Sequence, residues 1–344
     1  MRAGRASDFE EPHRQKNLLL RPKKLHKGEK NLKRIRLRTK IPKLPRLSKR
    51  KTKKNKQQIW IYNDGQLEQE QICPERLMRL IYENPVGGAS LLWLVKRKAV
   101  SRLYGLYCKT RLSARGITKF IEKYDIDMTG CDGNYKNFAQ FFAREKTGVV
   151  FPKEKNLLGS PCEGLVSVFS DIQPAQIITA KGSKFSLEEL FADAALAHEY
   201  SGGTMVSIRL TPANYHRMHF FDAGTVAETR KIKGDLYSVS PLALNRVVKL
   251  YCRNKRALIK FSSENFGDVV IVEVGATFVG SIVHCFKDGE RVERGDVASY
   301  FKPGGSLVLM FLKAGAFFPD ENLLARTTDG IETKISIGTT LNTF

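Results

Sequence analysis

Three short segments of this 344-residue chain hold the side chains best suited to chemistry. They are Ser160-Pro161-Cys162-Glu163-Gly164, Tyr215-His216-Arg217-Met218-His219 and Phe301-Lys302-Pro303-Gly304-Gly305-Ser306. Together they supply a carboxylate, two imidazoles and a serine on a glycine-flanked turn. These are the parts of a hydroxyl nucleophile that a base activates and an acid orients. Each segment alone is weak evidence, because strand-edge histidines usually bond backbone groups and a turn serine is ordinary.

The three segments belong to a longer set of motifs that resembles the phosphatidylserine decarboxylase family over nearly the whole of residues 59–338. The set is most similar to the bacterial subgroup with an N-terminal helical section. In chain order the motifs are NFAQFFARE (137–145), SPCEG (160–164), AKGSKFSLEEL (180–190), RLTPANYHRMHF (209–220), LYSVSPLAL (236–244), VGATFVGSI (274–282) and VERGDVASYFKPGGS (292–306). So many motifs in one order do not arise by chance.

The resemblance implies a proenzyme that cleaves itself between Gly305 and Ser306. Ser306 is the nucleophile, His219 is its base, and Glu163 orients the base. Because Gly305 has no Cβ, we expect it to adopt positive φ and to let the Ser306 hydroxyl reach the preceding carbonyl carbon. An N-to-O acyl shift, elimination and hydrolysis then leave a pyruvoyl group at position 306. The products, 1–305 and 306–344, are expected to stay associated through the strand after Ser306.

The resemblance also implies the reaction and its cofactor. The pyruvoyl group derived from Ser306 forms a Schiff base with phosphatidylserine and accepts the electron pair released when CO2 leaves, as pyridoxal phosphate does. The product is phosphatidylethanolamine. A proton must return to the α-carbon, and His216 or His219 is the candidate acid. No metal is expected.

Two positions depart from the family's usual pattern. The family usually carries Asp where this chain has Glu163, and Thr or Ser where it has Leu307. Glutamate keeps the carboxylate but adds a methylene, which shifts the geometry by about a bond length, enough to slow a preorganised step. Asp222 is a substitute carboxylate in sequence, three residues after His219, although we expect it to be a surface acid.

The positive charge of the chain is concentrated at its N-terminus. The whole chain has a net charge of +23, and residues 1–57 account for +18 of it, with 22 Lys/Arg against 4 Asp/Glu. We expect this basic arm to be disordered, and membrane attraction is its expected use. Residues 58–344 are nearly balanced and carry no known nucleic-acid reader motif, so no nucleic-acid partner is expected. The six widely spaced cysteines indicate reduced thiols in a cytosolic compartment.

The elements that must position these residues follow from hydrophobic periodicity. Gln58–Tyr62 reads as a strand that Asn63–Gln66 turns, and residues from about 74 to 148 read as helices. Ser186 is the predicted cap of a helix, with Glu189 at capping-box spacing. Further strands are predicted by runs of β-branched and apolar residues at 165–169, 204–210, 258–261, 269–274, 278–286 and 307–312.

These elements predict an α+β fold, with a helical region followed by a mostly antiparallel β core that is cleaved near its C-terminus. The predicted divisions are a basic arm (1–57), a helical region that contacts membrane (58–150) and a catalytic core (151–344). No segment has the roughly 20 apolar residues needed to span a bilayer. The enzyme is therefore expected to bind membranes peripherally, on the cytoplasmic face, through Leu91–Tyr107 and the arm. An ordinary packing helix is the alternative for Leu91–Tyr107.

Three other interpretations remain open at this point. The basic arm could make the chain a nucleic-acid binder, Glu163 and Leu307 could mark a degenerate member that does not cleave, and the pyruvoyl chemistry could act on another amine. A homo-oligomer is compatible with the sequence. Two bands on a denaturing gel would exclude the first two interpretations.

Overall fold

The computed structural model describes residues 59–72, 75–84, 98–175, 178–180, 183–277 and 281–342. Lys56–Phe344 form one compact unit. The basic arm and the segment 91–97 lie outside the described residues, so the predictions about them stay predictions. In the described part, no helix is both long enough and apolar enough to cross a membrane.

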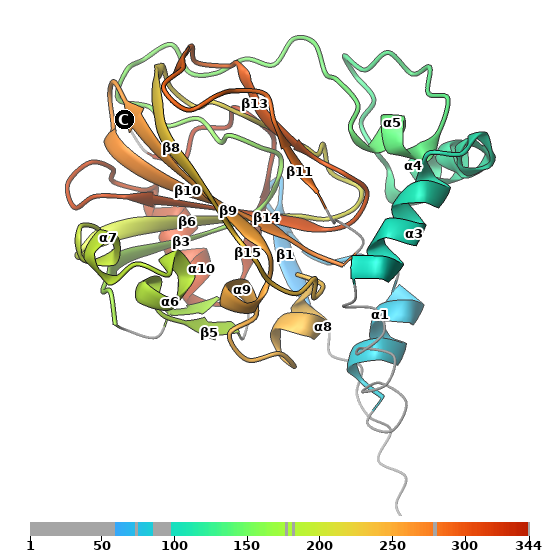
Figure 1. The fold of residues 1–344 in the computed structure, drawn as a ribbon, viewed down its shortest axis with the longest axis horizontal. Helices are drawn as coiled ribbons and strands as arrows, with labels where there is room; N and C mark the ends of the chain where they lie inside the picture. The colour runs from blue at the N-terminus through green and yellow to red at the C-terminus, as the bar shows by residue number, and fades with distance from the viewer. Residues whose placement is uncertain are drawn as a thin grey trace, which may run out of the picture. The chain divides into compact units, whose positions relative to one another are not determined.

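A ten-stranded sheet is the centre of the unit (Figure 1). Its strands are antiparallel except for one pair, β1 with β15, which confirms the predicted α+β fold with a mostly antiparallel sheet. In spatial order the strands are β12 (Arg291–Val292), β8 (Gly224–Ile232), β9 (Arg256–Ser263), β10 (Gly267–Gly275), β14 (Ser306–Leu312), β6 (Gly203–Leu210), β3 (Gly164–Ile172), β15 (Glu332–Ile335), β1 (Trp60–Asn63) and β2 (Gln66–Gln69).

Both faces of this sheet are covered, so the central strand β14 is buried at every position. Leu307, Leu309 and Phe311 pack into a layer formed largely by short helices, whereas Val308 and Met310 pack into the opposite layer. The helical layer contains α1 (Glu75–Tyr82), α6 (Leu187–Phe191), α7 (Ala194–His198), α8 (Pro241–Leu244) and α9 (Leu250–Arg253), with the hairpin β4 (Ile178–Ala180) and β5 (Ser183–Phe185) beside it. The opposite layer contains α10 (Glu321–Thr328) and a three-stranded sheet of β11 (Ile282–His284), β13 (Val297–Phe301) and β7 (Arg217–His219).

The predicted helical region is present between the first hairpin and the core. It consists of α1, α3 (Lys98–Cys108), the 3-10 helix η1 (Arg111–Gly116), α4 (Ile117–Tyr124) and α5 (Phe138–Phe142). Phe120, Phe138 and Phe141 pack their rings edge to face and join α4 to α5. The region is nevertheless tied to the core, because β1 and β2 are strands of the main sheet.

Local signals located most elements well. The predicted cap is confirmed, since the Ser186 hydroxyl accepts a hydrogen bond from the Glu189 amide. The predicted strands at 165–169, 204–210, 258–261, 269–274 and 307–312 correspond to β3, β6, β9, β10 and β14. The strand predicted at 278–286 is shorter, because β11 spans only Ile282–His284 and residues 278–280 lie outside the described part. The strands β8, β13 and β15 were not predicted.

The C-terminal segment is interleaved with the rest of the sheet. Strand β14 lies between β10 and β6, and β15 lies between β3 and β1. Both strands follow Gly305 in the chain, and all four of their neighbours precede it. Each strand is therefore hydrogen-bonded on both edges to residues N-terminal to the predicted cleavage site.

A buried ion cluster joins this C-terminal segment to the N-terminal hairpin. The Arg209 guanidinium of β6 donates to Glu70, after β2, at 2.8 and 2.9 Å and also donates to Glu332 of β15. All three side chains are about 95% buried. Both carboxylates bind the same guanidinium, and removing it would take this cation away from two buried negative charges.

We predict that Arg209→Met lowers the free energy of unfolding by about 3–5 kcal/mol. Urea unfolding measures the change, with Ser306→Ala present in both proteins to keep the chain in one piece. The matched control adds Glu70→Gln and Glu332→Gln to Arg209→Met, which removes both buried negative charges and should recover part of the loss. A loss below about 1 kcal/mol for Arg209→Met alone would show that the cluster is not a structural joint.

Candidate active site

Ser306 is the first residue of the central strand β14, and it is completely buried. Its neighbours across the sheet are Leu210 of β6 and Gly275 of β10. The hydroxyl lies 3.2 Å from Nδ1 of His216, which comes directly before β7. The structure thus brings together two of the residues that the sequence singled out, a serine and an imidazole, in a site without solvent access.

The hydrogen bonds of His216 define its tautomer. Nε2 lies 2.9 Å from the carbonyl oxygen of Thr211, which can only accept, so Nε2 carries the hydrogen. In the neutral ring, Nδ1 is then an acceptor for the Ser306 hydroxyl. Burial lowers the pKa of His216 to about 3, and the positive charge of Arg144 adds to this effect. The ring also stacks on Phe142 of α5, with centroids 3.8 Å apart.

His219, the base expected from the sequence, does not contact Ser306. Its Nδ1 donates to the carbonyl oxygen of Gly295 at 2.8 Å, and its Nε2 accepts from the Tyr215 hydroxyl at 3.0 Å. Burial lowers the pKa of His219 as well. In the intact chain, the imidazole in contact with Ser306 is therefore that of His216.

Glu163 reaches the site through two intermediates. Its Oε1 accepts from the side-chain amide of Asn214 at 2.7 Å, and the Asn214 oxygen accepts from both the amide and the hydroxyl of Thr211 at 2.8 Å. Thr211 in turn holds His216 through its carbonyl oxygen. The carboxylate thus supports the turn before His216 and bonds neither imidazole. Asn214 and Thr211 were missed as site residues, although both lie in the RLTPANYHRMHF motif.

The turn before Ser306 differs from the expectation for Gly305. The residue with positive φ is Gly304, at 143°, whereas Gly305 is outside the left-handed region. A Cβ added at Gly305 would meet Val239 at 3.5 Å, an ordinary contact distance. The prediction of positive φ at Gly305 is therefore wrong for the intact chain, because Gly304 already makes the turn.

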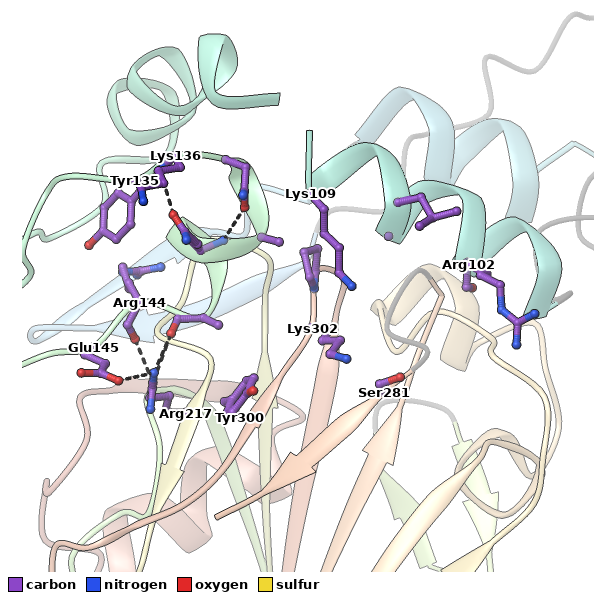
Figure 2. Close-up of a pocket in the computed structure, with 18 of the residues that line it drawn as sticks. Arg102, Lys109, Tyr135, Lys136, Arg144, Glu145, Arg217, Ser281, Tyr300 and Lys302 are labelled. Atoms are coloured by element: carbon purple, nitrogen blue, oxygen red, sulfur yellow. Dashed lines mark hydrogen bonds and ion pairs between the residues drawn. The ribbon is translucent and has the colours of Figure 1, made fainter. Parts of the chain in front are cut away.

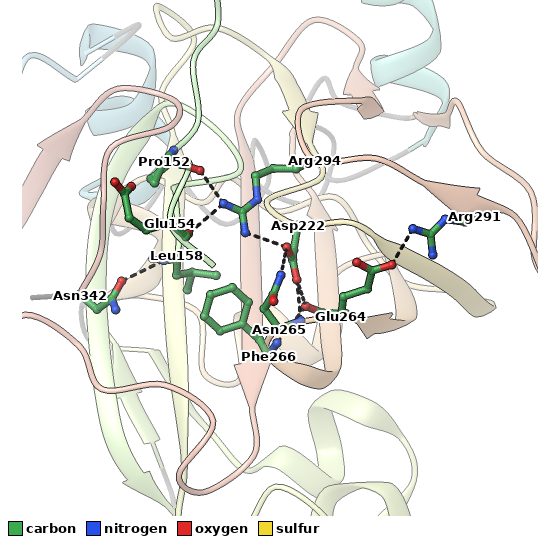
Figure 3. A network of polar contacts seen from close by, with 11 residues as sticks. Pro152, Glu154, Leu158, Asp222, Glu264, Asn265, Phe266, Arg291, Arg294 and Asn342 are labelled. Carbon is green, nitrogen blue, oxygen red and sulfur yellow. Dashed lines mark hydrogen bonds and ion pairs between the residues drawn. The ribbon is translucent and has the colours of Figure 1, made fainter. Parts of the chain in front are cut away.

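Asp222 is a structural carboxylate, and it is buried rather than on the surface as predicted. It accepts hydrogen bonds from Ser263 at 2.5 Å, from Asn265 through both the backbone and the side-chain amide, and from Arg294 at 2.8 Å (Figure 3). Although burial alone would raise the pKa of Asp222, these four hydrogen bonds hold it below its ordinary value. Arg294 also donates to the carbonyl oxygens of Pro152 and Glu154. The network therefore ties the segment 152–154, where the chain enters the predicted catalytic core, to the buried Asp222.

A pocket of about 1220 Å³ opens beside this site, between α3, α5 and the three-stranded sheet (Figure 2). Its lining includes Lys302 and Pro303, shortly before Ser306, and Arg217, next to His216. Cations outnumber anions in the lining. Five cations have no ion-pair partner among the described residues: Arg102, Lys109, Lys136, Lys302 and Arg144, whose guanidinium donates to backbone carbonyl oxygens.

The sequence analysis did not single out Glu273, another buried acid. Glu273 of β10 is fully buried, accepts from the Ser299 hydroxyl, and lies 2.7 Å from Nε2 of His284. Glu273 interrupts the otherwise apolar run Val269–Val274, and this interruption is the sequence signal that could have identified it as a candidate site residue. Close to it, burial raises the pKa of the Cys162 thiol well above its ordinary value, and Glu273 and Glu163 add to this effect. Cys162 therefore stays a neutral thiol and no nucleophile.

Comparison with known proteins decides the family. The sequence profile of phosphatidylserine decarboxylase matches residues 135–342, which include all three candidate segments. The chain belongs to the phosphatidylserine decarboxylase family. A phosphatidylserine decarboxylase proenzyme of Ruminiclostridium cellulolyticum is 42% identical over 287 residues, which cover 81% of this chain and 96% of the relative. Proenzymes of Clostridium perfringens and Clostridium botulinum are 40% and 39% identical, and the matches cover 94% and 99% of those relatives.

Membership confirms the resemblance inferred from the motifs. The profile does not reach α3, but the three relatives match 79–83% of the chain, so their similarity extends N-terminal to the profile.

The buried, neutral His216 predicts a pH dependence of stability. Its folded pKa lies below the ordinary value of about 6.5, so between pH 6.5 and 4.5 the unfolded chain takes up a proton that the folded chain does not. The free energy of unfolding should fall with falling pH, by up to about 1.4 kcal/mol per pH unit from this group. Urea unfolding of the Ser306→Ala chain measures the slope, and His216→Asn in that background should make it shallower. Equal slopes would contradict a neutral His216.

Proposed function

We propose that this chain is a phosphatidylserine decarboxylase that matures by cleaving itself between Gly305 and Ser306. The observation that carries the proposal is the 3.2 Å contact between Ser306 and His216 at the start of β14, in a member of this family. A serine hydroxyl facing a neutral imidazole nitrogen is arranged for proton transfer, and burial excludes water that would compete with the acyl shift.

The site fits a pyruvoyl group made from Ser306 itself. That group would supply an electron sink for the pair released when CO2 leaves. Position 306 is held from both sides by β6 and β10, so a new N-terminus there keeps its place. In the intact chain Ser306 is fully buried, whereas the pocket lining ends at Pro303. Cleavage releases the end of the segment 303–305, and we propose that this connects the pocket to position 306.

The two imidazoles receive different roles in this proposal. The resemblance to the family assigns His219 as the base for self-cleavage, which requires His219 to leave Tyr215 and Gly295. The contact with Ser306 supports His216 as the acid that returns the proton to the α-carbon. An anionic substrate nearby would raise the low pKa of His216 and favour its protonated form, which such an acid needs. Glu163 supports the turn that holds His216.

The cationic pocket is the proposed headgroup site. Phosphatidylserine carries a phosphate and a carboxylate, and the lining presents cations without ion-pair partners in the part of the chain that the structure describes, Arg102, Lys109 and Lys302 among them. These side chains can bind both anionic groups of the headgroup. A pyruvoyl decarboxylase for a free amine would not need so large a cationic opening, so the pocket favours a phospholipid.

The helix α3 is the proposed contact with the membrane. Leu103, Leu106 and Tyr107 are each more than half exposed, and Leu112 follows on η1 with 61% exposure. The same helix contributes Arg102 to the pocket, and Lys109, directly after its end, lines the pocket too. A helix that exposes apolar side chains beside a cationic pocket suits the interface of an anionic bilayer. Peripheral binding on the cytoplasmic face therefore remains our proposal, and the basic arm is its second component.

We predict that the purified chain gives two bands on a denaturing gel, corresponding to 1–305 and 306–344, and that Ser306→Ala gives one. Mass spectrometry of the short chain should show a blocked, pyruvoyl N-terminus. Decarboxylation of phosphatidylserine should be lost in Ser306→Ala, because no electron sink forms. Two chains from Ser306→Ala would disprove the nucleophile.

Histidine variants separate the two imidazoles in the same assay. We expect His219→Ala to remain uncut and His216→Ala to be cut but to decarboxylate at least about 100-fold more slowly, the lower range for a positioned acid. Glu163→Ala should cut slowly, and Glu163→Asp at least as fast as the parent. If His216→Ala stays uncut while His219→Ala matures, the roles are exchanged and the contact in the intact chain identifies the base directly.

We predict that Leu103→Glu with Tyr107→Glu weakens binding to anionic vesicles at every salt concentration, because apolar burial is not screened. Deleting residues 1–57 should weaken binding mainly at low salt, since each basic residue near the surface contributes about 1 kcal/mol within a Debye length. Vesicle sedimentation measures both, and Leu67→Glu, at an exposed site on β2, is the matched control. If the double variant sediments like its parent throughout, α3 is an ordinary packing helix.

A further inference from the structure

A small cavity of about 50 Å³ borders Gly305, the residue whose carbonyl carbon is attacked in the proposed cleavage. Val239, which also lines the cavity, belongs to the helical layer of the core. The ring of His216 lies with β7 and β13 in the opposite layer, where it contacts Phe301. The cavity borders Gly305 beside Val239, and Thr211, which also lines it, is the residue that holds His216. The volume of the cavity suffices for one water molecule.

Ser240 is the lining residue that stands out. Its Oγ is buried and is the one lining hydroxyl that lacks any hydrogen-bond partner within the described residues. Ser240 is also the N-cap of α8, where a serine hydroxyl normally accepts a backbone amide hydrogen, but here it makes no such bond. A buried hydroxyl without a partner costs folding free energy, so its retention calls for a reason.

The other polar side chains around the cavity have partners of their own. Arg209 is bound by two carboxylates. Thr211 donates its hydroxyl hydrogen to Asn214, and Thr277 donates to the carbonyl oxygen of Leu236. Ser238 accepts from the Ser240 amide at 3.2 Å, so its hydroxyl is bonded only as an acceptor, and within the described part Ser240 is the one lining hydroxyl with no partner at all. The Ser240 hydroxyl can therefore donate to a group that appears later.

Self-cleavage creates such a group. When the Ser306 oxygen bonds to the Gly305 carbonyl carbon, its proton passes to an imidazole of Tyr215–His219, and the carbonyl π pair moves to the Gly305 oxygen. The carbon–nitrogen bond then breaks, the nitrogen takes the proton, and an ester remains. Between these steps the Gly305 oxygen carries a negative charge, which only a preorganised donor can stabilise in a buried site.

We propose that Ser240 stabilises this oxyanion through one water molecule held in the cavity. The Ser240 hydroxyl donates to the water, and the water donates to the Gly305 oxygen. A bridging water is required because Ser240 makes no direct hydrogen bond to Gly305 in the intact chain. Ser240 thus orients the water before the reaction, and the hydrogen bond from the water to the Gly305 oxygen strengthens when the charge develops, which lowers the barrier more than it stabilises the ground state. This inference rests on the proposed cleavage at Gly305–Ser306.

The test compares three variants of Ser240 in freshly synthesised chain, with the appearance of the short chain followed over time on denaturing gels. Ser240→Ala should slow cleavage by about 100-fold, the lower range for loss of one oxyanion donor. Ser240→Thr keeps the hydroxyl and should cleave within about 10-fold of the parent, whereas Ser240→Val, its isostere without the hydroxyl, should be as slow as Ser240→Ala. Thermal unfolding temperatures of the uncut chains should not fall.

A matched control exists in the same fold. The Thr229 hydroxyl of β8 is also buried and without a partner in the described part, and Thr229 does not line the cavity. Thr229→Val should therefore cleave at the parental rate, which separates the loss of an oxyanion donor from the loss of any unsatisfied hydroxyl. Parental cleavage by Ser240→Ala, or equal rates for Ser240→Thr and Ser240→Val, overturns the inference and leaves the proposed function intact. A parent that never yields the short chain overturns the proposed function itself.

Discussion

The structure depends on one placement: Ser306 begins a strand that is hydrogen-bonded on both edges in the middle of a ten-stranded sheet. The neighbouring strands β6 and β10 hold the backbone of Ser306 from both sides, so the position of its side chain is restricted. The turn that precedes it, with Gly304 at positive φ, delivers the Gly305 peptide to the same point. The serine that we propose as the nucleophile is thus fixed by the sheet rather than by a loop, and in that proposal its surroundings need only supply proton transfer.

Few charged groups lie next to the Ser306 hydroxyl and the two imidazoles. Neither imidazole contacts a carboxylate, and burial lowers the pKa of both His216 and His219. Glu163 acts at a distance, through Asn214 and the turn at Thr211. A serine protease places its acid against the base, whereas Glu163 of this chain supports the turn before His216 and contacts neither imidazole. The longer side chain of Glu163 suits that indirect role, since the contact it makes is with an amide and not with an imidazole.

Patterns in the sequence located the elements well wherever a local rule determines the structure. The capping interaction of Ser186, the turn after β1 and the apolar run of β14 all follow from rules that act over a few residues. Strand β8 was not predicted because its exposed face is polar, and β15 was not predicted because two of its three buried residues, Glu332 and Thr333, are polar. The partners of both strands are also distant in the sequence. The pairing of β1 with β15 joins the two ends of the described chain, and no local pattern encodes such a contact.

The same limit applies to the site. Residue types and motifs singled out Ser306, Glu163 and the two histidines as candidates, but they did not show which imidazole contacts the serine, because the two histidines are only three residues apart in the chain. Asp222 was expected on the surface since its partners Ser263 and Arg294 are distant in sequence. Hydrogen-bond partners of buried polar groups are fixed by tertiary packing, which a single sequence does not reveal.

The interleaving of β14 and β15 with earlier strands has a consequence for the life of the protein after the cut. Before cleavage, these strands find their neighbours within one molecule, at the high effective concentration that a continuous backbone provides. After cleavage at Gly305–Ser306, the same pairing would be an encounter between two separate polypeptides, one of only 39 residues, 306–344. In the proenzyme all strands of the sheet belong to one polypeptide, whereas in the cleaved enzyme they would belong to two. A cleaved enzyme that unfolds, through heat or through attack by a protease, would then refold inefficiently. Its working lifetime would therefore be set by the rate at which the sheet unfolds.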